Sequence, residues 1–228
     1  MAPIDDTARA GTALVTSPVA VAIHHARRED DASLPMGGWE RELKRADWDA
    51  VIHLAAEALA SKGKDLQVAA WLLEALVHRH GFSAIAGGIH LLIRLCDEYW
   101  DELHPRVWED GYEPRTNIFL WINEKVTPNL RHVPLAAGSN GQSYALRDWE
   151  QARRNEQLPA SLNREVEGAG SAELSAALAA TPGNDHLERE RDLADALEML
   201  AALSSMLERR MGDDAPSLSV LGLTMIVP

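Results

Sequence analysis

The chain has 228 residues, 46% of them apolar, which is enough for one good-sized domain or a domain with an appendage. Its 22 basic and 35 acidic residues give a net charge of −13, which argues against a surface that follows nucleic-acid phosphates. The single cysteine, Cys96, excludes an intramolecular disulfide and is typical of a reducing compartment. No apolar run approaches the roughly 20 residues that cross a bilayer. Asp5 and Asp6 stand where an export signal needs cations, so we expect a cytoplasmic protein with no integral membrane segment.

The aromatic residues are confined to the middle of the chain. All of its 7 Trp, 2 Phe and 3 Tyr lie between Trp39 and Trp149. Aromatic side chains bury large areas in protein cores, so this distribution outlines the main folding unit. We expect an N-terminal, partly ordered arm at 1–35, a helical core at 36–150, a linker with a short helix at 151–184, a long amphipathic helix at 185–212 and a tail at 213–228.

The hydrophobic period inside 36–150 is that of a helix. Apolar side chains recur at i, i+3, i+4 and i+7 from Trp48 to Leu59, which places them on one helical face. Asp47 and Asp65 stand where N-cap carboxylates are expected for this helix and the next. The pattern predicts helices from Trp48 toward Gly63, from Leu66 to His80 with Gly81 as its stop, from about Ser83 to Leu103, and from Pro114 through Val126.

Glycine and proline modify this pattern at two places. The Gly87-Gly88 pair lies inside a predicted helix at a cost of roughly 1 kcal/mol per glycine relative to alanine. We expect the close approach of a neighbouring helix backbone to offset that cost. Pro128 and Pro134 are expected to bracket an extended connection, and a more polar helix is predicted at 143–157.

The last third of the chain is predicted to end in a long helix. After a linker with a short helix at 172–180, Asp185 and Glu188 resemble a capping box that opens a helix to Met211, with Gly212 as its stop. The β-prone run at 223–227 conflicts with the helical remainder. The fold class predicted is all-α: a multi-helix bundle of antiparallel helical hairpins with a long C-terminal packing helix.

The chain shows no recognisable catalytic or metal-binding motif. His78 and His80 stand about 200° apart around a helix, so they do not share a face. The sequence has no His-Glu-x-x-His and no Gly-x-Ser-x-Gly, and Cys96 has no partner at ligand spacing. We therefore predict no enzymatic activity, no cofactor and no metal site. A metal-dependent hydrolase that uses the histidines and an acidic rim is the alternative; the rim comprises Asp97, Glu98, Asp101, Glu102, Glu109, Asp110 and Glu113.

The tryptophans fall into two groups by their neighbours. Those within apolar helical stripes are predicted to anchor the core: Trp48, Trp71, Trp100 and Trp121. Those with charged neighbours are candidates for contact with a partner, because tryptophan is enriched in interface hot spots, with partial burial under a loop as the alternative: Trp39, Trp108 and Trp149.

Five runs carry a resemblance to a known family. In chain order they are ARREDDASLP at 26–35, WERELKRADW at 39–48, KDLQVAAWLLEA at 64–75, HGF at 80–82 and YWDELHP at 99–105. In this order and spacing they resemble the ImpA-type N-terminal domain of the TssA family, assembly components of the bacterial type VI secretion system. The resemblance covers about residues 20–150 and continues loosely through 212–218. The Ser-Lys-Asp-Leu run usual in the family reads Ser-Lys-Gly-Lys-Asp-Leu at 61–66 here.

The resemblance implies a non-enzymatic role as a protein-interaction domain. The expected partners are the baseplate, sheath and inner-tube proteins of the secretion machine, together with self-association. The expected location is the bacterial cytoplasm, at the inner face of the membrane through the secretion complex. Ring assembly, which the family attributes to its C-terminal regions, is not carried over to this chain. A purely structural dimerisation domain that uses the helix at 187–211 is a further alternative.

Overall fold

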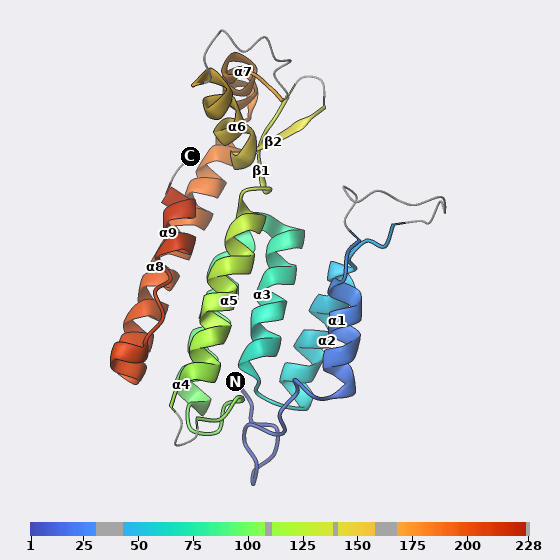
Figure 1. The fold of residues 1–228 in the computed structure, drawn as a ribbon, viewed down its shortest axis with the longest axis vertical. Helices are drawn as coiled ribbons and strands as arrows, with labels where there is room; N and C mark the ends of the chain where they lie inside the picture. Colours follow the sequence, from blue (N-terminus) through green and yellow to red (C-terminus); the bar gives the residue numbers. More distant parts are fainter. Residues whose placement is uncertain (31–42, 108–110, 139–140, 158–167, 227–228) are drawn as a thin grey trace.

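The computed structural model describes residues 1–30, 43–107, 111–138, 141–157 and 168–226, and it confirms a mainly helical fold (Figure 1). Short 3₁₀ turns occupy Gly81–Ala84 and Gly212–Asp214. The helices and strands are α1 (Pro18–Arg27), α2 (Trp48–Ser61), α3 (Leu66–His80), α4 (Ile85–Tyr99), α5 (Glu113–Leu130), β1 (Pro134–Ala137), β2 (Ser143–Ala145), α6 (Leu146–Glu156), α7 (Ser171–Ala180), α8 (Gly183–Met211) and α9 (Ser219–Ile226).

Two parts of different size make up the molecule. Helices α1–α5, α8 and α9, here called the bundle, pack as neighbours: α2 against α1 and α3, α3 against α4 and α5, α4 against α8, and α9 against α5. The antiparallel hairpin of β1 and β2 and helices α6 and α7, here called the lobe, gather at one end of the bundle (Figure 1).

Local capping explains several helix boundaries. The Asp47 carboxylate accepts a hydrogen bond from the Ala50 N–H at 2.9 Å, as expected of an N-cap at the start of α2. Gly81 ends α3 with a φ of 63°, a conformation that favours glycine, and its N–H bonds the Val77 carbonyl. Gly212 ends α8 in the same way, with a φ of 58°. These predicted ends are confirmed.

Other predicted boundaries were wrong. The stretch at 83–103 is a 3₁₀ turn followed by α4, which ends at Tyr99. Pro128 lies inside α5 rather than in a connection; it sits in the last turn, where only one helical hydrogen bond is lost. Residues 143–145 are extended, because they pair with 134–137 in the hairpin. Helix α8 starts at Gly183 without a side-chain cap, so the predicted capping box at 185–188 does not open it.

The two ends of the chain hold helices that the sequence pattern did not predict. Helix α1 buries Ala20 and Ile23 completely in the bundle. Residues 223–226 of the β-prone run are helical in α9, and residue 227 lies outside the described residues. In α9, Leu221 is buried and its N–H donates to Asn123 Oδ1 of α5 at 2.9 Å. Packing against α5 therefore outweighs the local β preference in α9.

The paired glycines of α4 differ in their surroundings. A Cβ on Gly88 would lie 2.4 Å from Leu73 Cδ1 of α3, whereas a Cβ on Gly87 would meet nothing within 4 Å. The expected close approach therefore exists at Gly88 alone, and it is made by a side chain rather than by a helix backbone.

The buried apolar residues form two separate clusters. The larger one, the bundle core, includes residues from Ala10 to Met225, so segments 1–35, 185–212 and 213–228 contribute to it along with 36–150. The smaller one, the lobe core, consists of Ala136, Tyr144, Ala152, Leu174 and Ala177, with Trp149 and Ala169 packed against it. Within the described ranges, none of the helices is both long enough and apolar enough to traverse a bilayer.

Candidate functional site

The structure places five of the seven tryptophans. Trp71 and Trp100 are buried in the bundle core, and Trp48 and Trp121 are partly buried against it. Trp149 is partly buried against the lobe core. Trp39 and Trp108, the other two candidates for partner contact, lie outside the described residues.

An arginine of α1 joins two of the core tryptophans. The Arg27 guanidinium carbon lies 5.6 Å from the ring centroid of Trp71 and 5.1 Å from that of Trp121, within the range of cation–π attraction. Arg27 Nε also donates to Glu74 Oε2 at 2.6 Å, and Glu74 is buried. These contacts connect α1 to α3 and α5. The Arg27 charge therefore stabilises the packing of the three helices.

A second arginine closes the end of α4. Arg115 of α5 is only 1% exposed, and its guanidinium donates to the carbonyls of Pro105 at 2.9 Å, Trp100 at 2.8 Å and Leu103 at 2.6 Å. Its guanidinium carbon lies 4.5 Å from the Trp100 ring centroid. Burial lowers the pKa of Arg115. The three bonds satisfy the carbonyl of the residue that caps α4, Trp100, and two carbonyls of the loop that follows.

Three distant segments meet beside the start of α3. The Lys64 N–H donates to the Ala10 carbonyl at 2.7 Å, and the His104 N–H donates to the Lys64 carbonyl at 3.0 Å. The Asp65 carboxylate accepts from the Leu14 N–H at 2.9 Å and caps α3. Burial raises the pKa of Asp65 even though backbone N–H groups donate to it. The run at 61–66 is thus a packing junction.

The same junction buries a lysine and a glycine. Lys64 is 2% exposed, and its Nζ donates to the Leu59 carbonyl at 2.7 Å. Burial lowers the pKa of Lys64. A Cβ on Gly63 would lie 2.0 Å from the Thr12 carbonyl oxygen, so only glycine leaves room for the segment around Thr12. No local sequence signal indicates these burials, because the segment that packs over Gly63 and Lys64 comes from the start of the chain.

The residues considered for chemistry do not converge. Cys96 is buried, and burial raises the pKa of its thiol to about 12. In the acidic rim, Glu98 pairs with Arg94, and Asp97 lies 4.0 Å from Arg210. Within the described ranges, no three His, Cys, Asp or Glu side chains stand together as a metal-binding group. Rim residues 109 and 110 lie outside those ranges.

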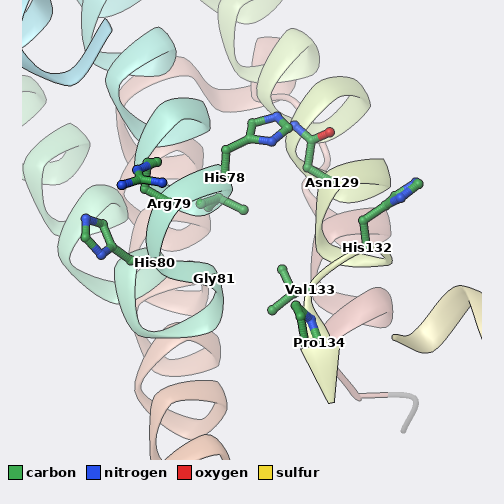
Figure 2. Close-up of a pocket in the computed structure, with 9 residues that line it drawn as sticks. His78, Arg79, His80, Gly81, Asn129, His132, Val133 and Pro134 are labelled. Carbon is green, nitrogen blue, oxygen red and sulfur yellow. The ribbon is translucent and has the colours of Figure 1, made fainter. Parts of the chain in front are cut away.

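A polar pocket of about 370 Å³ lies between the C-terminal ends of α3 and α5. Figure 2 shows His78 of α3 pointing toward Asn129 of α5, whereas Arg79 and His80 point to the other side of α3. Thus His78 and His80, which the helical spacing separates, do not meet here. The lining residues are Val77, His78, Arg79, His80, Gly81, Asn129, His132, Val133 and Pro134.

Two of the pocket histidines, His78 of α3 and His132 in the turn after α5, have close neighbours. The His78 ring stacks on Trp48, with 3.9 Å between the ring centroids and an interplanar angle of 7°. Desolvation lowers the pKa of His78, and it lowers the pKa of His132 together with the nearby charge of Arg147. Both rings are therefore neutral at neutral pH.

The helical bundle with its lobe resembles a domain of known structure. It is similar to the N-terminal domain including the conserved ImpA_N region of the TssA component of the type VI secretion system from Burkholderia cenocepacia, with a TM-score of 0.85 and 29% identity. The match covers 98% of this chain and 86% of that chain. The profile described as "ImpA, N-terminal, type VI secretion system" matches residues 1–124. Since that is more than half of the chain, the chain belongs to the ImpA N-terminal family, as a TssA-type domain of the type VI secretion system.

A curated relative agrees with this assignment. The chain is 32% identical over 108 residues to the type VI secretion system component TssA1 of Pseudomonas aeruginosa, strain PAO1. The aligned region covers 47% of this chain and 29% of TssA1. The chain therefore matches less than a third of the length of that relative.

Proposed function

We propose that this domain is a non-enzymatic protein-interaction module that helps to assemble the baseplate, sheath and inner tube of a type VI secretion machine. The observation that carries the proposal is the likeness to a TssA N-terminal domain along 98% of the chain. The proposed location is the bacterial cytoplasm, at the inner face of the membrane through the secretion complex.

The use of the buried charges supports a non-enzymatic role. Arg115 and Asp65 form hydrogen bonds with backbone groups of other segments, and Lys64 donates to the Leu59 carbonyl at the end of the preceding helix. A catalytic group needs a pKa matched to its task and access to a substrate, whereas the Cys96 thiol is buried with a pKa near 12. Stoichiometric zinc, manganese or iron in the purified protein, lost together with a hydrolase activity, would contradict this part of the proposal.

We assign the partner contacts to the tryptophans with charged neighbours in the sequence, Trp39, Trp108 and Trp149. Trp149 is the described member of this group, and it lies on α6 between Asp148 and Glu150 with part of its ring exposed. A partly exposed tryptophan supplies a large contact area at a low cost in side-chain entropy. Trp39 and Trp108 remain in the proposal because they too have charged neighbours in the sequence.

Co-purification from cells that express the type VI components tests the proposal. The domain should enrich baseplate, sheath or tube proteins over an unrelated acidic helical domain. Trp149→Ala should reduce capture and leave the helical circular dichroism unchanged, whereas Arg153→Ala, an exposed change on the same helix, should leave capture intact. No enrichment by the unsubstituted domain would overturn the proposal, and unfolding of the lobe by Trp149→Ala would remove Trp149 from the interface.

Self-association is the other proposed contact. Light scattering on the full chain should report the mass of a dimer if two copies pair in solution. A monomer at the concentrations used for capture would restrict the proposal to other proteins and would exclude the alternative of a purely structural dimerisation domain.

A further inference from the structure

Helix α9 and the turn before it carry no charge. Residues 215–226 contain no Asp, Glu, Lys, Arg or His, although 25% of the residues of the chain are charged. One face of α9 packs on the bundle through Leu221 and Met225, which are buried. On the other face, Val220 and Leu223 are 49% and 60% exposed. A helix that is apolar on both faces is normally buried on both, so the exposed face of α9 is a candidate contact surface.

A groove of about 450 Å³ lies between α8 and α9, at the outer edge of the bundle (Figure 1). The two helices come close here, since a Cβ on Gly222 would lie 3.3 Å from Leu200 Cδ2. Leu223 stands one turn from Ser219, which lines the groove, and one turn from Val220. Val220 and Leu223 therefore form an apolar ridge along the edge of the groove. The other side of the groove is lined by residues of α8 that include Leu197, Leu200 and Ala201.

The charge of the chain limits which surface two copies can share. Each copy carries a net charge of −13, so two copies repel one another wherever acidic surfaces face each other. In 0.15 M salt the Debye length is about 8 Å, so a contact through an uncharged surface avoids most of this repulsion. Among the described residues that line the groove, only Glu208 is charged. A second copy can therefore approach this face without bringing many like charges together.

A twofold contact also requires a surface that complements itself. In a symmetric dimer the same patch of both subunits is in contact, so a protruding part must lie beside a recess of matching chemistry. The ridge of Val220 and Leu223 and the neighbouring groove meet this condition, because both are largely apolar and they lie side by side. A different protein would need only one of the two features.

We propose that a second copy of this chain docks on this face, with Val220 and Leu223 of each copy inserted into the groove of the other. The contact buries the exposed apolar face of α9 in both copies, and the burial of apolar surface supplies its free energy. The proposal rests on the proposed function in taking self-association as one of the contacts of the domain, and it assigns that contact to α8 and α9.

Analytical ultracentrifugation of the intact chain tests the contact, and we expect an equilibrium of monomer and dimer. Leu223→Asp should raise the dissociation constant of the dimer at least about a hundredfold, because each copy loses an apolar side chain from the contact and gains a charge. Val21→Asp makes the same type of change at an exposed valine of α1, on the other side of the bundle (Figure 1), and should change the constant less than about twofold. A monomer at every concentration, or equal effects of the two variants, would overturn the proposal.

A variant on α8 tests the groove separately from the ridge. Ala201→Glu places a charge in the groove and leaves α9 unchanged, and it should weaken the dimer as strongly as Leu223→Asp. A dimer that is sensitive to Leu223→Asp and insensitive to Ala201→Glu would overturn the insertion of the ridge into the groove.

Salt distinguishes an apolar contact from one made by ion pairs. Raising the salt from about 0.05 M to about 0.5 M should strengthen the dimer, because salt screens the repulsion between two acidic copies. Dissociation of the dimer in high salt would overturn the proposal. A monomer that still captures secretion proteins would refute this inference and leave the proposed assembly role standing.

Discussion

The bundle and the lobe bury very different kinds of interior. The bundle core joins elements from Ala10 to Met225 and contains aromatic rings, long aliphatic chains and charged groups that bond backbone carbonyls. The lobe core has one aromatic ring, that of Tyr144, and otherwise Leu174 and alanines. Because apolar stabilisation grows with the area buried, most of the free energy of folding belongs to the bundle.

The link between the two parts combines an apolar contact, Leu135 of β1 packed against the bundle core, with polar contacts. The Arg147 N–H donates to the Arg131 carbonyl at 3.1 Å, and Arg131 lies 3.6 Å from Glu150. Exposed contacts of this kind contribute little free energy. We therefore expect the lobe, with its smaller core, to open at a lower free energy than the bundle.

The largest effect is expected from removing the arginine that closes α4. Arg115→Met should lower the free energy of unfolding by about 3 kcal/mol, because three buried carbonyls lose their donors. Urea denaturation followed by circular dichroism measures the loss. Arg106→Met, an exposed change of the same type, is the control. A loss equal to that of the control would show that the carbonyls find other donors.

Leucine truncation separates the two cores. Leu92→Ala in the bundle should lower the global free energy of unfolding by about 2–5 kcal/mol. Leu174→Ala, at an equally buried position in the lobe, should increase amide exchange in α6 and α7 while the urea midpoint of the bundle stays unchanged. If both substitutions move that midpoint equally, the two clusters unfold as one.

The paired glycines of α4 sharpen the picture of the bundle. Gly88→Ala should destabilise by about 1–3 kcal/mol because its methyl meets Leu73, whereas Gly87→Ala should stabilise by up to about 1 kcal/mol through helix propensity. Thermal melting of the two variants gives the comparison. The same sign for both changes would refute the contact at Gly88.

Acid should weaken the end of the bundle that faces the lobe. Folding lowers the pKa of His78 and His132 below the ordinary value of 6.5, so the unfolded chain binds more protons just below that pH. Their contribution is fully present above pH 6.5 and is lost as pH falls through the lowered values. Urea midpoints between pH 7.5 and 5 should fall, with a shallower slope for His78→Gln than for His90→Gln, a substitution on α4. Parallel slopes would exclude His78 as the cause.

Sequence reasoning succeeded where the cause of structure is local. The ends of α3 follow from Asp65 and Gly81, whose side chain and backbone act within one turn. It failed where distant packing decides: α9 is helical against α5 despite its β preference, and docking of this kind depends on a segment that no short window contains. The hairpin of 134–137 and 143–145 is local, but its strands are too short to give a clear alternating pattern.

The candidate site shows the same division. Helical spacing excluded a shared face for His78 and His80, and the close-up agrees (Figure 2). The burial of Arg115 was missed, since the carbonyls that it bonds are brought together only by the fold. The burial of Lys64 was missed because a segment from the start of the chain packs beside it, where its N–H bonds the Ala10 carbonyl.

Native-state hydrogen exchange of the intact chain tests the central claim that the bundle and the lobe are units of unequal stability. Amides of α6 and α7 should exchange through openings of much lower free energy than those of α3 and α4, and low urea should accelerate only the lobe. A single opening free energy shared by all four helices would contradict the claim.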